Sequence, residues 1–289
     1  MKKILITGAD SYVGESVRKY ILSKENNFVI DSVDTRNEVW KHTDFSKYDV
    51  VFHVAGIAHV NADPSMEPLY YKVNRDLTIE IAKFAKAAGV KQFIFMSSQI
   101  VFHESQSLKS EILTTKTKEN PNGFYGASKL QAEIGIKELE TSFFSVCILR
   151  PPMIYGVGAK GNFPRLARLA TKVLIFPAWH NKRSMLYIDN LAEFVLQVVN
   201  RSLRGTFYPQ NKELSDTVEI IRFFANHAGH KVWISKLFNP LVWLGSFALQ
   251  SINKMFATYY YDPEMSVTDF DYQLVSLEES LKIVAESFK

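Results

Sequence analysis

The sequence predicts an α/β protein with a doubly wound parallel sheet and a smaller C-terminal lobe. Stretches with apolar residues at helical spacing predict helices over 12–24, 77–88 and 125–139. Between them lie five short runs rich in Val, Ile and Phe, each typical of a buried strand: KKILIT (2–7), FVIDSV (28–33), DVVFHV (49–54), QFIFMS (92–97) and FSVCIL (144–149). Strands that alternate strictly with helices favour right-handed crossovers and therefore a parallel sheet.

The alternation ends after Pro151, where turns, short strands and isolated helices follow. One of these helices, over 216–229, opens with an Asp-x-x-Glu pattern that is typical of a helix N-terminus. We expect a nucleotide-binding domain of residues 1–158 plus about 184–207. The substrate lobe is expected to comprise about 159–183 and 208–289.

Composition excludes several functional classes. The net charge of +4 is spread along the 289 residues, so no basic arm for nucleic acid is present. The single cysteine, Cys147, lies in an apolar run and is expected to be a buried core residue. His53 and His59 show no metal-ligand spacing, and we expect hydrogen-bonded structural histidines and no metal.

The apolar segments are too short to cross a bilayer. The run in MKKILITG has only four residues, fewer than a signal peptide needs. The run FNPLVWLGSFALQ (238–250) is interrupted by Asn239, Pro240 and Gly245. It could lie on a membrane surface, but we expect a helix that faces the core. These features predict a cytoplasmic protein without an integral membrane segment.

The first predicted strand leads into TGADSYVG, a loop suited to a dinucleotide pyrophosphate. Gly8 and Gly14 allow a tight turn into a helix N-terminus, whose amides and dipole attract phosphate. Ser11 replaces the middle glycine, and its hydroxyl can turn to a phosphate. Together with Tyr12 and Val13, these residues are the first candidate cofactor ligands of a Rossmann-type domain.

An acid ends the second predicted strand. Asp34, 26 residues after Gly8, would accept hydrogen bonds from the adenosine ribose hydroxyls, which favours NAD. Arg36 could instead meet a 2′-phosphate, so NADP stays open. A solvated turn aspartate is the alternative interpretation.

Hydroxyl and ammonium groups converge on the same sheet edge. Ser98 follows the fourth strand, and Tyr125 begins a helix with Lys129 one turn later. A phenol with a pKa of about 10 is a weak base at neutral pH, but a nearby ammonium favours the phenolate. Tyr125 is therefore a candidate base for removing a hydroxyl proton while hydride leaves the same carbon. We expect Leu130, Ile134 and Leu139 to anchor this helix in the core.

Motifs spread over nearly the whole chain resemble the extended short-chain dehydrogenases/reductases of the NAD-dependent epimerase/dehydratase family, which contains UDP-glucose 4-epimerase. They are TGADSYVG, FHVAGIAHV, YYKVNRDLT, FIFMSSQIVF, YGASK, RPPMIYGVG, RSMLYIDNLAEF and VSLEESL. The resemblance implies that Tyr125 is the base, Lys129 its activator and a ribose ligand, and Ser98 a second hydroxyl that also contacts substrate.

The resemblance also implies further ligands and partners. Ala55, Gly56, Asn74 and Pro152 would contact the cofactor. Asn162 and Arg183 would hold the diphosphate of a UDP-sugar, where a guanidinium can pair two phosphate oxygens. Relatives often pair through a four-helix interface, which implies a homodimer that includes the helix beginning at Tyr125.

Three functions remain open at this point. The first is C4 epimerisation of a UDP-hexose, which Asp34 and an NAD preference favour. The second is reduction of a 4-keto-6-deoxy-hexosamine nucleotide for surface polysaccharides, and the third is a non-catalytic dinucleotide-binding regulator. Gln99 and Ile100 stand where the dehydratases of the family carry an Asp-Glu pair, which argues against dehydration.

Overall fold

The computed structural model describes residues 1–58, 63–105 and 107–288, so His59 lies outside the described residues. The chain forms two compact units. The first comprises 1–103, 118–151 and 188–209, and the second comprises 104–117, 152–187 and 210–289. The segments 104–117, 152–158 and 184–187, which we expected in the nucleotide-binding domain, belong to the second unit, and 208–209, which we expected in the substrate lobe, belong to the first.

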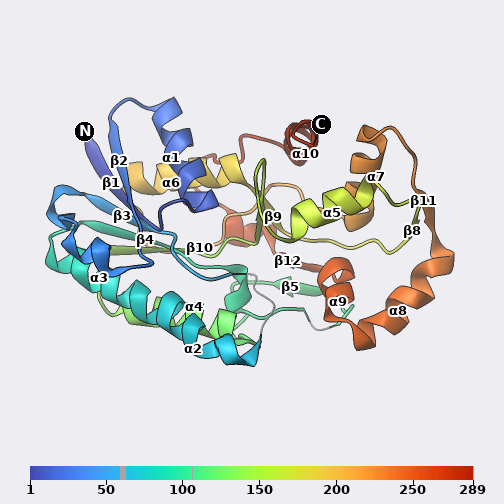
Figure 1. Cartoon of the computed structure of the whole chain (residues 1–289), viewed down its shortest axis with the longest axis horizontal. Coiled ribbons are helices and arrows are strands. Elements are labelled where there is room, and N and C mark those ends of the chain that lie inside the picture. Colours follow the sequence, from blue (N-terminus) through green and yellow to red (C-terminus); the bar gives the residue numbers. More distant parts are fainter. Residues whose placement is uncertain (59–62, 106, 289) are drawn as a thin grey trace. The chain divides into compact units, whose positions relative to one another are not determined.

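A six-stranded parallel sheet forms the centre of the first unit, as Figure 1 shows. Its order is β10 (Gly205–Phe207), β6 (Ser145–Leu149), β4 (Gln92–Met96), β3 (Val50–His53), β1 (Lys2–Thr7) and β2 (Phe28–Val33). All five predicted strands are present and parallel, which confirms the α/β fold class. The chain reverses its direction of winding between β1 and β3, so the switch point lies there. One expectation is wrong: β2 is an edge strand, and its Asp31 and Ser32 are exposed.

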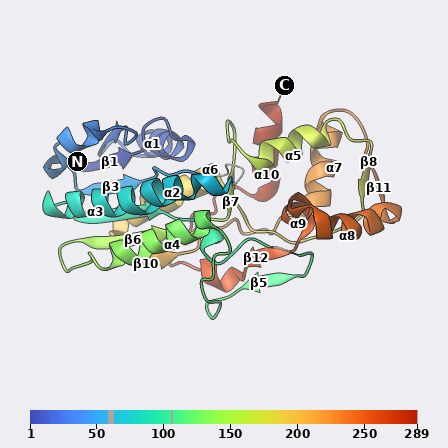
Figure 2. The same cartoon turned by 60° about the horizontal axis from the view of Figure 1, so that its bottom comes forward.

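Helices cover both faces of this sheet. α1 (Tyr12–Lys24) and α6 (Ile188–Arg201) pack side by side on one face, while α3 (Leu77–Ala87) and α4 (Phe124–Lys137) lie on the other (Figures 1 and 2). The segment before α3 was not predicted: α2 (Glu67–Tyr70) runs into a π-helical turn over Tyr71–Asp76. Core side chains fill the layer against α3 and α4, among them Trp40, Phe45, Phe93 and Ile136.

α4 buries polar side chains beside apolar ones, where we expected a purely apolar face. Ser128, Lys129 and Glu133 are buried, while Ile134 is 53% exposed. The expected role of Ile134 as an anchor is therefore wrong. Leu139 does pack against the core, and Leu130 is half-buried. Residues 129 and 133 lie about 100° around the helix axis from residues 130 and 134, and tertiary packing decides which of these two directions is buried.

The second unit combines short parallel strand pairs with five helices among its described residues. The pairs are β5 (Glu111–Leu113) with β12 (Tyr259–Tyr261), β7 (Met153–Tyr155) with β9 (Met185–Tyr187), and β8 (Ile175–Pro177) with β11 (Trp233–Ser235). The helices are α5 (Asn162–Ala170), α7 (Thr217–His227), α8 (Asn239–Ala248), α9 (Gln250–Phe256) and α10 (Leu277–Glu286). Asp216 caps α7 as its sequence pattern indicates, because its carboxylate accepts from the amides of Val218 and Glu219.

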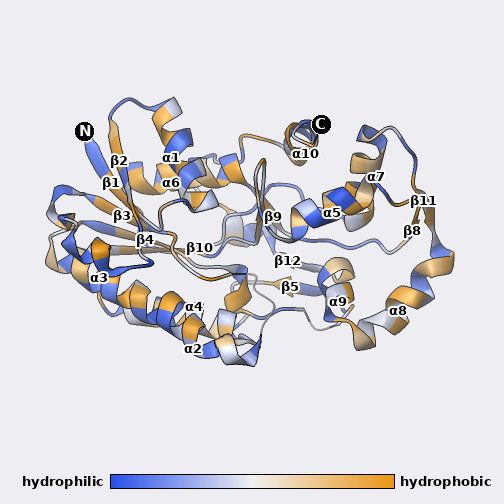
Figure 3. Ribbon diagram, viewed as in Figure 1, coloured by the Kyte–Doolittle hydropathy of each residue, from blue (hydrophilic) through white to orange (hydrophobic). Residues whose placement is uncertain are grey.

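The apolar segment 238–250 does not face the core. Val242 is the only residue of α8 that is buried, and Leu241, Trp243, Leu244 and Phe247 are more than half exposed. Figure 3 shows this helix in hydrophobic colours along most of its length. None of the described helices combines the length and hydropathy that crossing a bilayer requires.

Gly8 has a conformation and a neighbour that exclude a side chain. Its φ is +112°, and a Cβ there would lie 2.9 Å from the backbone nitrogen of Ala55. We expect Gly8→Ala to lower the free energy of unfolding by about 3 kcal/mol, from backbone strain and the clash together. Gly89, with φ +83° and nothing within 4 Å, is the matched control, and its alanine variant should lose about 1 kcal/mol. Equal losses in urea unfolding would contradict the close contact.

Candidate active site

The loop after β1 forms a cradle at the start of α1. The amides of Gly8 and Ala9 donate to the carbonyl of Val33, at distances of 2.9 and 3.1 Å, which ties the loop to the end of β2. Ser11 is the N-cap of α1, and its Oγ accepts from the Gly14 amide at 3.1 Å. A hydroxyl that accepts one hydrogen bond still has its own proton to donate. Ser11 can therefore occupy the position of the expected middle glycine and still offer a donor to a phosphate.

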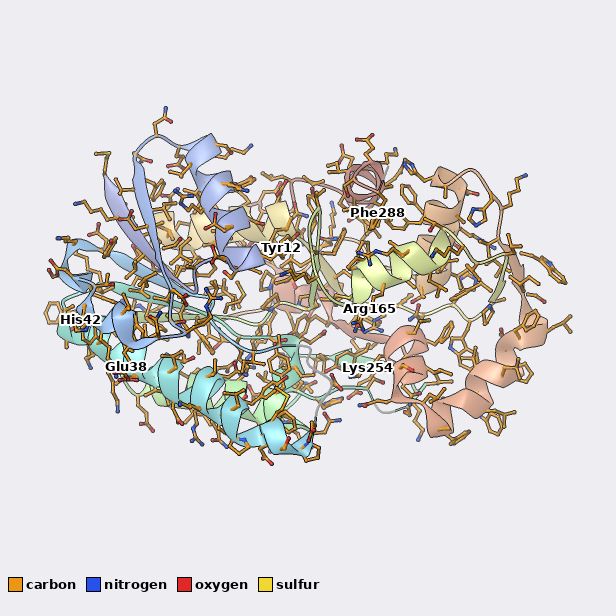
Figure 4. The ribbon with its side chains drawn as sticks, viewed as in Figure 1. Tyr12, Glu38, His42, Arg165, Lys254 and Phe288 are labelled. Atoms are coloured by element: carbon orange, nitrogen blue, oxygen red, sulfur yellow. The ribbon has the colours of Figure 1, made fainter. Side chains whose placement is uncertain are left out.

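Close packing explains why the loop ends in glycine. A Cβ on Gly14 would lie 2.6 Å from the Oγ of Ser11 and 3.0 Å from a methyl carbon of Ile6. Tyr12 and Val13 form the first turn of α1, and Figure 4 shows Tyr12 at that end. The cradle fits a dinucleotide pyrophosphate, because a 13-residue helix presents its N-terminus beside the switch point of the sheet.

Asp34 and Arg36 lie beyond the end of β2 and bind each other. The Nε and Nη2 of Arg36 donate to the Asp34 carboxylate at 2.7–3.0 Å, and Asp10 lies 3.6 Å from the same guanidinium. Hydrogen bonds from Arg36 lower the pKa of Asp34. The two groups expected to distinguish NAD from NADP thus occupy one position as an ion pair.

The end of β3 is joined to the helices by Asn74. Its side-chain oxygen accepts from the Ile57 amide at 2.8 Å, and its nitrogen donates to the Ile57 carbonyl and to Ser128 Oγ. A Cβ on Gly56 would lie 3.0 Å from Asn74 Oδ1 and 3.1 Å from Lys129 Nζ. Glycine at position 56 therefore lets the lysine reach this edge of the sheet. Ala55, the preceding residue, donates its amide to the carbonyl of Thr7.

Lys129 is a buried ammonium at the ends of β3 and β4. Its Nζ donates to the Met96 carbonyl at 2.9 Å and lies 4.7 Å from the centre of the Phe95 ring. Burial lowers its pKa to about 8, although Glu133 raises it. The lysine is therefore charged at neutral pH but poorly solvated, which strengthens its effect on a neighbouring phenol.

His53 supports this lysine as a neutral structural residue. It accepts from Thr7 Oγ1 through Nδ1 at 2.7 Å and donates from Nε2 to Thr78 Oγ1 at 2.9 Å, because Thr78 itself donates to the Asn74 carbonyl. Burial and the charge of Lys129 lower its pKa to about 3. The expectation of a hydrogen-bonded structural histidine is confirmed.

Tyr125 and Ser98 come from segments that touch. Ser98 caps the 3₁₀ turn Gln99–Val101 by accepting from the Ile100 amide at 3.3 Å. Gly126, next to Tyr125, packs so tightly on this turn that a Cβ would lie 2.5 Å from the Ile100 carbonyl oxygen. The ring of Tyr125 contacts Tyr70 edge to face at 6.0 Å. The fold thus brings the predicted base, its activator and the second hydroxyl to one edge of the sheet.

A buried ion pair behind these residues was not predicted. Glu133, one turn after Lys129, accepts from Arg150 at 2.5–3.2 Å and from Ser97 Oγ at 2.5 Å. Arg150 also donates to Glu119 at 2.7 Å and lies over the rings of Phe102 and Tyr208. Burial disfavours its charge, but Glu133 more than offsets this and raises the pKa of Arg150. Two features of the sequence could have indicated this pair. Arg150 is a charged residue at the end of the apolar run CILR, and Glu133 is a carboxylate eight residues after Tyr125 on the same predicted helix.

The remaining candidates belong to the second unit. Pro152 is buried directly before β7, and Asn162 is the exposed first residue of α5. Arg183 exchanges backbone hydrogen bonds with Ser215, and burial lowers the pKa of its guanidinium. Cys147 is buried, and the described residues contain no cluster of side chains that could hold a metal.

Comparison with known proteins identifies the family. Residues 4–208 match the NAD dependent epimerase/dehydratase family, and the chain belongs to that family of NAD-dependent, nucleotide-sugar-modifying enzymes. A UDP-glucose 4-epimerase of Vibrio cholerae is 33% identical over 259 residues, covering 80% of this chain and 77% of that protein.

Solved structures share the fold. UDP-glucuronic acid 4-epimerase from Bacillus cereus, crystallised with NAD, has a TM-score of 0.74 at 20% identity, covering 99% of this chain and 96% of that one. dTDP-4-dehydrorhamnose reductase from Bacillus anthracis, crystallised with NADP, has a TM-score of 0.65 at 21% identity, covering 81% and 85%. At these identities the likeness concerns the fold.

The lowered pKa of Lys129 predicts how stability depends on pH. A folded-state pKa of about 8, below the 10.5 of a free lysine, means that the unfolded chain holds this proton more tightly. Burying the ammonium therefore reduces the free energy of unfolding at pH 7, and this penalty disappears as pH rises from about 8 to about 10.5. We expect the stability of Lys129→Met relative to wild type to fall by about 3 kcal/mol over that window.

Urea unfolding at several pH values measures this difference, and groups shared by both proteins cancel. Lys137→Met, at an exposed lysine of the same helix, is the control and should show no trend. A pH-independent difference for Lys129→Met would contradict a desolvated ammonium.

The buried pair predicts strong coupling between α4 and the sheet. Glu133→Ala leaves Arg150 without its main partner and should reduce the free energy of unfolding by about 3–5 kcal/mol. The double variant Glu133→Leu with Arg150→Met should lose much less unfolding free energy than the summed losses of Glu133→Leu and Arg150→Met measured singly. Glu278→Ala, which breaks the exposed pair with Lys282, should change stability by less than about 1 kcal/mol. Additive effects in this double-mutant cycle would refute the coupling.

Proposed function

We propose that this enzyme epimerises a UDP-hexose at C4, with Tyr125 as the base. The observation that carries the proposal is the buried Lys129 one turn after Tyr125, beside Gly56 and Asn74 at the switch point of the sheet. The likeness to a UDP-glucose 4-epimerase over 80% of the chain supports this reaction over others in the family.

The protein's own residues would act on the sugar as follows. The Tyr125 phenolate takes the proton of the C4 hydroxyl, while the hydrogen on C4 departs as hydride. Lys129 favours the phenolate by its charge, and the hydroxyl of Ser98 donates to the oxygen at C4. A bound nicotinamide supplies the acceptor and later the donor of that hydride. Return of hydride to the opposite face, and of the proton from Tyr125 to oxygen, produces the epimer.

Each unit has a proposed binding role. In the first, the cradle at α1 would hold the pyrophosphate, Asp34 the adenosine ribose, and Ala55, Gly56 and Asn74 the nicotinamide side. In the second, Pro152 is proposed to border the cofactor, while Asn162 and Arg183 are proposed ligands of the sugar diphosphate.

A second candidate is reduction of a 4-keto-6-deoxy-hexosamine nucleotide. The position of Arg36 favours it, because a guanidinium beside Asp34 and Asp10 could turn to the 2′-phosphate of NADPH. A non-catalytic regulator is least favoured, because Tyr125, Lys129 and Ser98 are all retained.

The two reactions can be separated directly. The protein is incubated with UDP-glucose or UDP-N-acetylglucosamine, and the C4 epimer is measured by NMR. A parallel assay supplies a 4-keto-6-deoxy nucleotide sugar with NADH or NADPH and follows absorbance of the reduced cofactor. Epimer without added cofactor supports the first function, and cofactor consumption supports the second. Tight NAD binding without turnover in either assay would refute both.

Removal of the Tyr125 hydroxyl tests the assigned base. We expect Tyr125→Phe to lower turnover at least about a hundredfold and to leave the Kd for NAD nearly unchanged. Tyr71→Phe, at a tyrosine that stacks on Arg75, is the control and should keep its activity. Wild-type turnover in Tyr125→Phe would show that another group removes the proton.

We also propose a cytoplasmic homodimer that pairs through α3 and α4. Ile134 on α4 and Phe84 on α3 are exposed apolar side chains on the helices that cover this face of the sheet. Sedimentation analysis of Ile134→Asp tests the pairing, because a charge at a dimer contact should shift the protein to monomer.

A further inference from the structure

α8 and the turn before it expose an apolar surface that no part of the proposed reaction uses. Leu237, Leu241, Trp243, Leu244 and Phe247 are 77%, 62%, 53%, 57% and 75% exposed. We refer to these five residues as the α8 face. At 3.6 residues per turn, the four on the helix fall within an arc of about 160°, and Val242 points the opposite way into the second unit. Surface helices of globular proteins place polar residues on the outward side, and this helix does not.

Two more apolar side chains are exposed on the strand pair that leads into α8. Trp233 on β11 pairs with Ile175 on β8, and both side chains are exposed, at 59% and 44%. The 3₁₀ turn Lys236–Phe238 connects β11 directly to α8. Contiguous apolar patches larger than a few hundred Å² are rare on monomeric soluble proteins and mark interaction surfaces.

The segment that carries this surface contains basic residues and no acidic ones. The sequence contains no aspartate or glutamate from Ile220 to Tyr261, but it contains Arg222, Lys231, Lys236 and Lys254. Arg222 pairs with Glu219 and Lys254 with Glu104. Lys231 and Lys236, at the two ends of β11, are exposed and form no ion pair within the described part of the chain. Lys172, next to β8, is exposed as well.

We propose that the α8 face docks onto the surface of an anionic phospholipid bilayer. Its leucines and Phe247 would enter the boundary between headgroups and acyl chains, and Trp243 suits that depth because its ring is amphipathic. Lys231, Lys236 and Lys172 would meet lipid phosphates. α8 has ten residues, too few to span a bilayer, so the helix would lie in the interface plane.

A bilayer fits this surface better than a protein partner. The outward arc of α8 carries no charged side chain, and the two polar residues of the helix, Asn239 and Ser246, donate to the carbonyls of Ala178 and Trp243. α8 itself therefore offers a protein partner few of the hydrogen bonds that protein interfaces contain. A fluid lipid surface requires no register. The combination of a bare apolar face and unpaired lysines at its border matches the two attractions that hold interfacial helices.

Vesicle flotation with the full chain tests the proposal. We expect the wild type to float with phosphatidylcholine vesicles that contain one third phosphatidylglycerol, and to float less in high salt. Leu244→Ser with Phe247→Ser should reduce binding at least about tenfold. Lys231→Glu with Lys236→Glu should reduce it about fivefold or more on the anionic vesicles and have little effect on pure phosphatidylcholine.

Controls separate this outcome from unfolding and from self-association. Phe143→Ser removes an apolar side chain that is 86% exposed in the first unit and should bind vesicles like the wild type. Near-ultraviolet circular dichroism and NAD binding of the α8 variant should match the wild type. The blue shift of tryptophan fluorescence on vesicles should be smaller in Trp243→Phe than in the wild type.

Three results would overturn the proposal. The first is a wild-type protein that floats with neither kind of vesicle, and the second is an α8 variant that floats as well as the wild type. The third is a wild-type dimer that becomes monomeric in the α8 variant without vesicle binding, which would make the face a contact between copies. Neither readout depends on turnover, so failure of the proposed reaction would leave this test intact.

Discussion

The arrangement of the candidate site depends on the buried pair between Glu133 and Arg150. Arg150 directly follows β6, Ser97 directly follows β4, and both bind the same carboxylate on α4. Taking two charges out of water is unfavourable unless the remaining hydrogen-bonding groups are satisfied, and here the guanidinium meets two carboxylates and two rings. Because Lys129 and Tyr125 precede Glu133 by one and two turns, this pair sets where both reach the edge of the sheet.

Burying the charged form of Lys129 lowers the stability of the folded protein. Its ammonium has a backbone carbonyl and an aromatic ring as neighbours instead of water, and its pKa falls accordingly. His53 behind it stays neutral because two threonines fix its ring and burial disfavours its charge. A second cation is thereby avoided next to the first. Burial and charge are combined where the proposed chemistry requires a phenolate, and the nearest buried charges, Glu133 and Arg150, neutralise each other.

α4 and α8 illustrate opposite uses of apolar sequence. α4 turns Ile134 outward and buries Lys129 and Glu133, because the strand ends supply partners for these polar groups. α8 contains hardly any polar residues, yet only Val242 is buried, because the second unit packs against one side of it. In the first unit polar side chains of a helix are buried at the candidate site, and in the second apolar side chains of a helix stay exposed.

Local pattern determined the elements of this protein, and tertiary contacts decided which faces they bury. The five strands, α1 and the cradle of Gly8, Ser11 and Gly14 followed from the sequence, because a buried strand, an amphipathic helix and a glycine turn each depend on residues close together in the chain. The candidate residues Tyr125, Lys129 and Ser98 could be named because a parallel sheet brings strand ends to one edge. The pair of Glu133 with Arg150 joins residues 17 apart across two layers. The outward turn of α8 likewise depends on what packs behind it, which no period in the sequence records.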